Sequence, residues 1–151
     1  ESRSQTMPDF LPDMLEAGTH NIPGIAGLMA GAEFVRTRGV ESIGAHERGL
    51  LQRLARALES VPELEVFASK EPSAQSGVLS VRHPRIELGA ELGRRGVCVR
   101  AGLHCAPLAH ESAGTIENGT VRLSFSPFNR SADADRAATQ LRASVKSLLD
   151  D

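Results

Sequence analysis

The sequence predicts an α+β fold in which a small mixed or antiparallel sheet is covered by helices. Apolar residues recur at helical spacing near both ends of the chain, and short segments with strand-like alternation lie between them. The resulting order is helix, helix, strand, strand, helix, strand, strand, helix. A length of 151 residues, of which 40% are hydrophobic, is enough for one domain with a sizeable core.

The N-terminal part of the chain predicts an extended lead-in over residues 1–20, followed by a helix. Asn21 is placed to cap this helix, which has Pro23 in its first turn and runs to Arg38. One helix face is apolar, and another consists of glycines, which would let a neighbouring backbone come close. We interpret the glycine face as a site of tight packing within the domain. The two faces consist of Ile25, Leu28, Met29 and Ala32, and of Gly24, Gly27 and Gly31.

The middle of the chain predicts a long helix, two strands and a third helix. Segment 40–60 carries leucines at helical spacing and is stopped by Pro62. Segments 64–69 and 77–83 are short, rich in β-branched and apolar residues, and separated by a polar loop, which is typical of strands. A proline then opens a helix that is expected over 84–96.

The last third predicts a strand at 97–102, a strand at 119–126 and a final helix capped by Ser131. Cys98 falls in the middle of the first of these strands, so we expect it to be buried and without chemistry. The segment 101–119 between the strands is irregular. Long ordered loops of this kind are more often functional than not.

Composition excludes several classes of function. The formal net charge is −2, which gives no electrostatic footprint for nucleic acid or for an anionic membrane. No apolar run approaches the length needed to span a bilayer. The two cysteines do not make a disulfide framework, so a reducing cytoplasm is the expected compartment.

The stretch RAGLHCAPLAH at 100–110 places a cysteine among an arginine and two histidines. A thiol becomes a useful nucleophile when nearby positive charge stabilises its thiolate. Arg100 precedes Cys105 by five residues, His104 is adjacent, and Gly102 permits a sharp turn. Cys105 is therefore a candidate nucleophile.

Three other interpretations of Cys105 are open at this point. It can be a small buried thiol. It can ligate zinc together with Cys98, His104 and His110, although adjacent residues are hard to aim at one ion. It can act in a Cys–His hydrolase, for which a base is available from His46, His83 or His110.

Two further stretches can bind anions. In EAGTHN, Gly18 lets the backbone approach a ligand, Thr19 offers a hydroxyl, and the helix start that follows favours negative charge. The alternative for this stretch is a helix cap. Arg122, on the strand face opposite Val121 and Leu123, is placed to bind a carboxylate through two nitrogens, or else is an ordinary exposed arginine.

Three stretches, EAGTHNIPGIAGL, RAGLHCAP and VRLSFSPFN, occur in the order of one family. Together they resemble the C-terminal part of cysteine desulfurases of the class V aminotransferase fold. The similarity is closest to the group with an R-x-G-x-H-C-A loop, which includes selenocysteine lyase-like members. The resemblance implies the C-terminal domain of a fold-type I pyridoxal phosphate (PLP) enzyme over 21–151, with 1–20 as the end of the preceding large domain.

The resemblance also implies a chemistry. In such enzymes PLP condenses with L-cysteine, and a protein cysteine takes the substrate sulfur as a persulfide and leaves alanine. Carried onto this chain, Cys105 would form the persulfide and Arg122 would hold the substrate carboxylate. Arg100 and His104 would support substrate binding in the same site.

A homodimer and a cofactor contact follow from the same resemblance. Thr19, preceded by Gly18, matches a residue that reaches the PLP phosphate of the partner subunit. A protein that accepts the sulfur is a further implied partner, and no metal is expected.

Two departures from the family pattern limit the expected activity. Leu103 stands where the loop usually has a first histidine. Lys70 and Lys146, the two lysines of the chain, both lack the family's Ser-x-His-Lys setting for the PLP-bound lysine. We therefore expect the C-terminal portion of a longer desulfurase, inactive by itself. The alternatives are a free-standing module that accepts sulfur or mediates dimerisation, and another class V activity such as a lyase or a transaminase.

Overall fold

The structure is a computed structural model that describes residues 6–150. The chain divides into two compact units, Glu1–Gly39 and Val40–Asp151. Residues 1–5 of the predicted lead-in lie outside the described residues. The domain boundary predicted after residue 20 concerns the organisation of a longer enzyme and stays a prediction.

The first unit contains a 3-10 helix, η1 (Asp13–Leu15), and the helix α1 (Ile22–Arg38). The predicted cap of α1 is confirmed, because the Oδ1 atom of Asn21 accepts the backbone N–H of Gly24 at 3.0 Å. A side chain at Gly24 would collide with the Asn21 side chain, so the absence of a Cβ there makes this close approach possible.

The packing predicted for α1 is wrong. Leu28 and Met29 are 75% and 71% exposed, and α1 has no buried residue. A methyl group added at Gly27 or Gly31 would meet nothing within 4 Å. The reason is that, among the described residues of this unit, η1 is the other helix and no strand is present for α1 to pack against.

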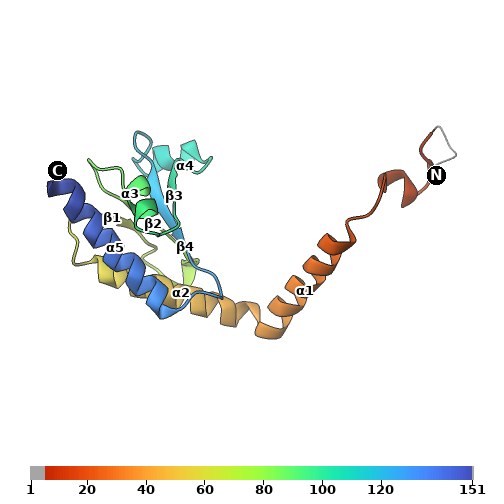
Figure 1. Cartoon of the computed structure of the whole chain (residues 1–151), viewed down its shortest axis with the longest axis horizontal. Helices are drawn as coiled ribbons and strands as arrows, with labels where there is room; N and C mark the ends of the chain where they lie inside the picture. Colours follow the sequence, from red (N-terminus) through yellow and green to blue (C-terminus); the bar gives the residue numbers. More distant parts are fainter. Residues whose placement is uncertain (1–5, 151) are drawn as a thin grey trace. The chain divides into compact units, whose positions relative to one another are not determined.

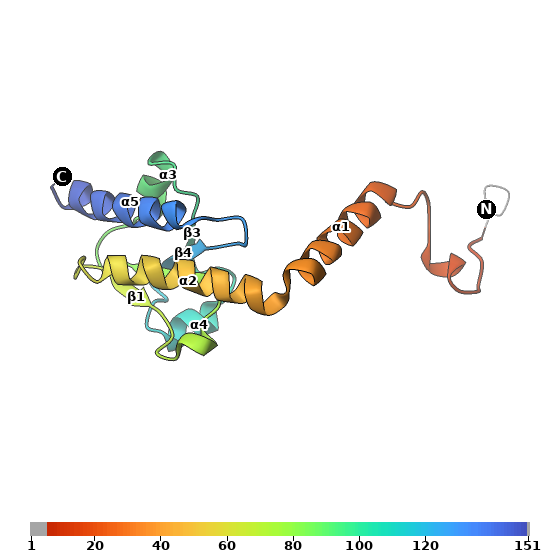
Figure 2. The same ribbon diagram turned by 90° about the horizontal axis from the view of Figure 1, so that it is seen from below.

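The second unit is built on a four-stranded antiparallel sheet (Figures 1 and 2). The strand order is β1-β2-β4-β3, so β1 and β3 are the edges. The bounds are β1 (Glu65–Phe67), β2 (Val78–Arg82), β3 (Arg100–Gly102) and β4 (Thr120–Ser124). The predicted class, a small antiparallel sheet with helices, is confirmed.

Two long helices, α2 (Val40–Leu58) and α5 (Ser131–Asp150), lie side by side and pack on the sheet (Figure 2). Both were predicted from their apolar spacing, and both bury that stripe. The buried core contains Leu51, Leu54 and Leu58 of α2, Leu79 and Val81 of β2, Val121 and Leu123 of β4, and Ala134, Ala138, Leu141 and Val145 of α5. This core fixes which face of the sheet is covered.

The helix predicted over 84–96 and the strand predicted over 97–102 are both shorter than expected. The helix predicted over 84–96 is α3 (Gly89–Arg94), because the chain before it turns tightly where the backbone N–H of Arg85 donates to Nδ1 of His83. The strand predicted over 97–102 pairs with β4 only from Arg100. Cys98 therefore precedes the ladder and is exposed, which corrects its expected burial.

The segment 101–119 is more regular than predicted. It contains a short helix, α4 (Pro107–Ser112), that begins two residues after Cys105. Ser131 is the first residue of α5 and not its cap, which corrects the prediction. The side chain that binds a backbone N–H at this helix start is Asp133, whose carboxylate accepts the N–H of Arg130 at 2.8 Å. None of the helices in the described part of the chain is both long and apolar enough to cross a membrane.

Candidate active site at the cysteine loop

The two faces of the sheet differ in chemistry. Val121 and Leu123 of β4 point into the core, so Arg122 between them lies on the opposite face. Arg122 is the register partner of Ser80 on β2 and of Arg100 on β3. The alternation predicted for this strand is confirmed, and it places two arginines next to each other on the face that the core does not use.

The Arg122 side chain has a hydrogen-bond donor without a partner. Its side chain is half-buried, and its Nε–H is buried with no partner in the structure. A buried donor without an acceptor costs roughly 1–3 kcal/mol, so such groups need an explanation. An anion with two oxygens, such as a carboxylate, would satisfy Nε and a terminal nitrogen together.

Cys105 lies just beyond the end of β3, in a turn that begins after Gly102. His104 and Cys105 both adopt left-handed backbone conformations, with φ of 53° and 58°. The thiol is exposed, and the Nη2 atom of Arg100 lies 3.6 Å from its Sγ atom. The structure therefore brings together the exposed sulfur and the guanidinium that the sequence singled out.

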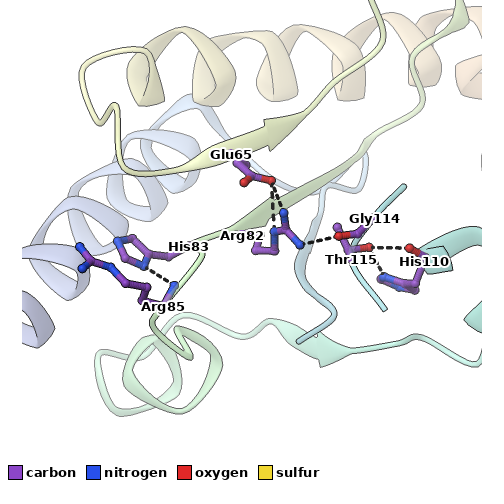
Figure 3. A network of polar contacts seen from close by, with 7 residues as sticks. All are labelled: Glu65, Arg82, His83, Arg85, His110, Gly114 and Thr115. Carbon is purple, nitrogen blue, oxygen red and sulfur yellow. Dashed lines mark hydrogen bonds and ion pairs between the residues drawn. The ribbon is translucent and has the colours of Figure 1, made fainter. Parts of the chain in front are cut away.

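His104 is held on its other side by the backbone. Its Nε2 lies 3.0 Å from the carbonyl oxygen of Arg100. A carbonyl can only accept, so Nε2 carries the proton and Nδ1 is the ring nitrogen that can take one up. The ring centroid of His104 lies 5.5 Å from that of His110, which is buried in α4. His110 in turn contacts the Thr115 hydroxyl through Nδ1 at 2.7 Å (Figure 3).

The structure gives little support to the zinc and hydrolase interpretations of Cys105. Among residues 6–150, no three His, Cys, Asp or Glu side chains gather as a metal-binding group. His46 contacts the carbonyl of Asn129 and His83 accepts from Arg85, so both are committed elsewhere. The Cys105 sulfur contacts an arginine, Arg100, and not a histidine.

Comparison with known proteins identifies the family. The model of the aminotransferase class-V family matches residues 3–137. The chain belongs to the class V aminotransferase family. It matches the C-terminal part of cysteine desulfurases of this fold.

Three relatives illustrate the match. A probable cysteine desulfurase of Mycolicibacterium paratuberculosis is 36% identical over 126 residues, which are 82% of this chain and 18% of that protein. A cysteine desulfurase of Serratia proteamaculans is 32% identical over 91% of this chain and 33% of its own length. The apo cysteine desulfurase of Thermococcus onnurineus NA1 superposes with a TM-score of 0.79 at 30% identity, over 90% of this chain and 34% of its own. The chain thus spans about a third or less of the length of these relatives.

Membership of the class V aminotransferase family implies PLP, which is held through its aldehyde by a lysine and through its phosphate by N–H and hydroxyl donors. The chain's two lysines, Lys70 and Lys146, are both exposed. A lysine that forms a Schiff base is activated by a desolvated or cationic environment, which an exposed side chain lacks. These lysines do not fit the aldehyde.

The residues before α1 fit a phosphate contact in part. Gly18 has a φ of 82° and Thr19 is exposed, so a hydroxyl is accessible there. The N–H groups of the helix start are already used, because Ile22 donates to the carbonyl of His20 and Gly24 to Asn21. The helix-cap interpretation of this stretch is therefore confirmed, and a phosphate would rely on Thr19. Gly18 and Thr19 lie in the first unit and the other candidate residues in the second.

Sequence reasoning missed the contacts that support the loop. The sequence presents His110 only as a possible base, and no motif singles out Thr115. The signal that could have found them is that both lie in the long irregular segment 101–119.

Proposed function

We propose that this chain is the C-terminal portion of a PLP-dependent cysteine desulfurase in which Cys105 takes the sulfur of L-cysteine. The observation that carries the proposal is the guanidinium of Arg100, 3.6 Å from an exposed sulfur. A guanidinium at this distance offers electrostatic support to a sulfur that acts as a nucleophile. A loop that only packed Cys105 as a hydrophobe would hide the sulfur.

The proposed step transfers one sulfur atom. The Cys105 thiolate attacks the sulfur of the bound substrate, an S–S bond forms, and the C–S bond of the substrate breaks with its electron pair left on carbon. That carbon then takes a proton and becomes the methyl group of alanine, while Cys105 holds the persulfide. PLP, when bound, would supply the electron sink for the pair left on carbon.

Arg122 is proposed to hold the substrate carboxylate. Its unpartnered Nε–H and the neighbouring terminal nitrogen offer two parallel donors, which match two carboxylate oxygens. Since Arg100 is its register partner, the carboxylate site and the thiol lie on one sheet face. Nδ1 of His104, beside Cys105, is available to hold a proton during the transfer.

The remaining partners follow from this role. We propose that Thr19, with Gly18, contacts the PLP phosphate of a partner subunit in a homodimer, in the cytoplasm. No lysine of this chain fits the cofactor aldehyde, so we propose that the chain is inactive alone. The exposed Cys105 sulfur would be accessible to a protein that accepts the persulfide sulfur.

A pair of cysteine variants tests the proposal in the full-length protein. Cys105→Ala should abolish formation of alanine from L-cysteine and the mass increase of one sulfur atom on the chain. Cys98→Ala is the matched control, because Cys98 is also exposed but lies before β3, at the other end of the strand. Alanine formation that survives Cys105→Ala would overturn the proposal and favour a transaminase or lyase.

A second candidate function is a module that only accepts sulfur. The observation that favours it is the combination of an exposed Cys105 with two lysines unsuited to PLP. A separate desulfurase supplied with L-cysteine should then transfer sulfur to Cys105 of the isolated chain. Transfer without any alanine formation by the full-length protein would favour this function.

A further inference from the structure

We propose that His110 is a positioning residue of the cysteine loop. Its buried ring, fixed by Thr115, supports the ring of His104 and so holds Cys105 beside Arg100. The inference rests on the proposed function in one respect, which is that Cys105 is the thiol whose reactivity matters.

The loop at His104 and Cys105 needs support because its backbone is strained. Two consecutive residues other than glycine have φ values of 53° and 58°. A left-handed conformation costs such residues about 1–2 kcal/mol each, and it persists only where the surroundings impose it. The hydrogen bond from His104 to the Arg100 carbonyl restrains one end of the ring. The face of that ring needs a second support.

His110 supplies a rigid surface for the His104 ring. It is only 7% exposed, and Thr115 is only 1% exposed, so neither side chain is free to move into solvent. The two histidine rings lie 5.5 Å apart at a tilt of 37°, which is a packed arrangement of rings. His104 is therefore held between the backbone of β3 and a buried ring of α4.

The contact between His110 and Thr115 can form whether or not Nδ1 of His110 carries a proton. The Thr115 hydroxyl can donate to Nδ1 of a neutral ring at 2.7 Å. It can instead accept from a protonated Nδ1 and turn its own hydrogen toward the His110 carbonyl, 3.4 Å away. Because both arrangements keep the 2.7 Å contact, the ring stays in place in either state.

The Thr115 end of the network is anchored to the sheet (Figure 3). Gly114, next to Thr115, accepts a hydrogen bond at 2.8 Å from Nη1 of Arg82 on β2. Arg82 is itself held by Glu65 of β1, through contacts of 2.7 and 3.1 Å to one carboxylate oxygen. The support of the cysteine loop thus extends from the edge strand β1 to Cys105.

Two variants of Thr115 separate positioning from packing. Thr115→Val keeps the shape but removes the hydroxyl, and Thr115→Ser keeps the hydroxyl but removes a methyl group. The readout is the rate of Cys105 alkylation by iodoacetamide in the full chain, divided by that of Cys98 in the same sample. We expect the ratio to fall about fivefold in the valine variant, the factor for one hydrogen bond of about 1 kcal/mol, and to hold within about twofold in the serine variant.

A packing role predicts the opposite order, because serine leaves a cavity and valine does not. That order, or equal ratios in both variants, would overturn the proposal. If the valine variant does not fold, His110→Asn keeps a partner for Thr115 but lacks the ring against His104, and the same fivefold loss is expected. An unchanged ratio in this variant would also overturn the proposal. Alkylation needs no cofactor or substrate, so a failure to release sulfur from L-cysteine would refute the proposed function alone.

Discussion

Arg100 and Arg122 are cross-strand partners in the antiparallel ladder of β3 and β4, so two arginine side chains leave the sheet on the same face. Like charges directly opposite each other are destabilising by roughly 0.2–1 kcal/mol. Arg100 lies against the Cys105 sulfur, whereas Arg122 has a buried Nε–H with no partner. The two arginines therefore differ in what they contact, and Arg122 keeps a buried donor for which an anion is the proposed partner.

The first prediction concerns Arg122. Replacing it with Met removes one of the two facing charges, so the free energy of unfolding should stay level or rise by up to about 1 kcal/mol. The same change should lower kcat/KM for L-cysteine about 100-fold in the full-length protein, since a charge-assisted bidentate contact is lost. Arg122→Lys should recover less than half of the free energy that corresponds to this fall in kcat/KM, because a lysine cannot donate two parallel hydrogen bonds to a carboxylate. Steady-state kinetics and urea unfolding measure the two effects.

A matched control for Arg122 is Arg130→Met. Arg130 is exposed just before α5 and donates its backbone N–H, not its side chain, to the Asp133 carboxylate. This variant should leave kcat/KM within about twofold of the parent. An Arg122→Met variant with unchanged kcat/KM would contradict the assignment of Arg122 to the carboxylate.

The second prediction concerns Arg100 and the reactivity of the thiol. Arg100→Gln removes the positive charge 3.6 Å from the sulfur, so alkylation of Cys105 by iodoacetamide should slow several-fold at neutral pH, with Cys98 unaffected. Both partners are exposed, so added salt should screen the attraction. The parent rate should therefore fall between about 10 mM and 1 M salt, while the Arg100→Gln rate stays flat. Equal salt dependence in the two proteins would contradict an electrostatic role for Arg100.

Much of the fold follows from periodicity that is visible in the sequence. The leucine stripes of α2 and α5 and the alternation of Val121, Arg122 and Leu123 depend only on local geometry, and they identify the core and the arginine face. Cys98 was misplaced because its orientation depends on where β3 starts to pair with β4, which is a long-range property. The packing expected for the glycine face of α1 depends on a neighbouring element that the described residues of its own unit do not provide.

The candidate site was predictable as a set of residues but not as an arrangement. Cys105, Arg100 and Arg122 stand out by residue type and by family resemblance. The left-handed turn at His104 and the buried pair of His110 and Thr115 have no sequence pattern of their own, because they depend on the folded path of the loop. α4, from Pro107 to Ser112, is too short for helical periodicity to be detected.

The third prediction concerns acid stability and Glu91. A hydrogen bond from Arg94 lowers the pKa of the Glu91 carboxyl, a second from Arg95 lowers it further, and burial acts in the opposite direction. Because the pKa is lower in the folded than in the unfolded protein, the stabilisation is complete above pH 4.5, the ordinary value, and is lost as pH falls through the folded value.

The variant Glu91→Gln should therefore lose stability at pH 7 and show a smaller further loss between about pH 5 and pH 3. Arg94→Gln should change this acid-induced loss of stability more than Arg95→Gln, since the hydrogen bond from Arg94 lowers the pKa of Glu91 the most. Urea unfolding at a series of pH values measures the loss. If Glu91→Gln loses as much stability between about pH 5 and pH 3 as the parent, other carboxylates are responsible for the loss.

The last prediction uses two glycines with the same backbone conformation. Gly114 and Gly119 both have a φ of 66°, so alanine at either position pays about 1–2 kcal/mol for a left-handed conformation. A Cβ at Gly114 meets nothing within 4 Å, whereas one at Gly119 would lie 2.5 Å from the backbone carbon of Gly102. Gly119→Ala should therefore cost about 3 kcal/mol of unfolding free energy, against about 1 kcal/mol for Gly114→Ala. Because Gly102 ends β3 and begins the turn to Cys105, the Gly119 variant should also lower the ratio of Cys105 to Cys98 alkylation, and the Gly114 variant should not. Equal losses of stability in the two variants would mean that the backbone at Gly102 yields without cost, and that the cysteine loop is not held by this close approach.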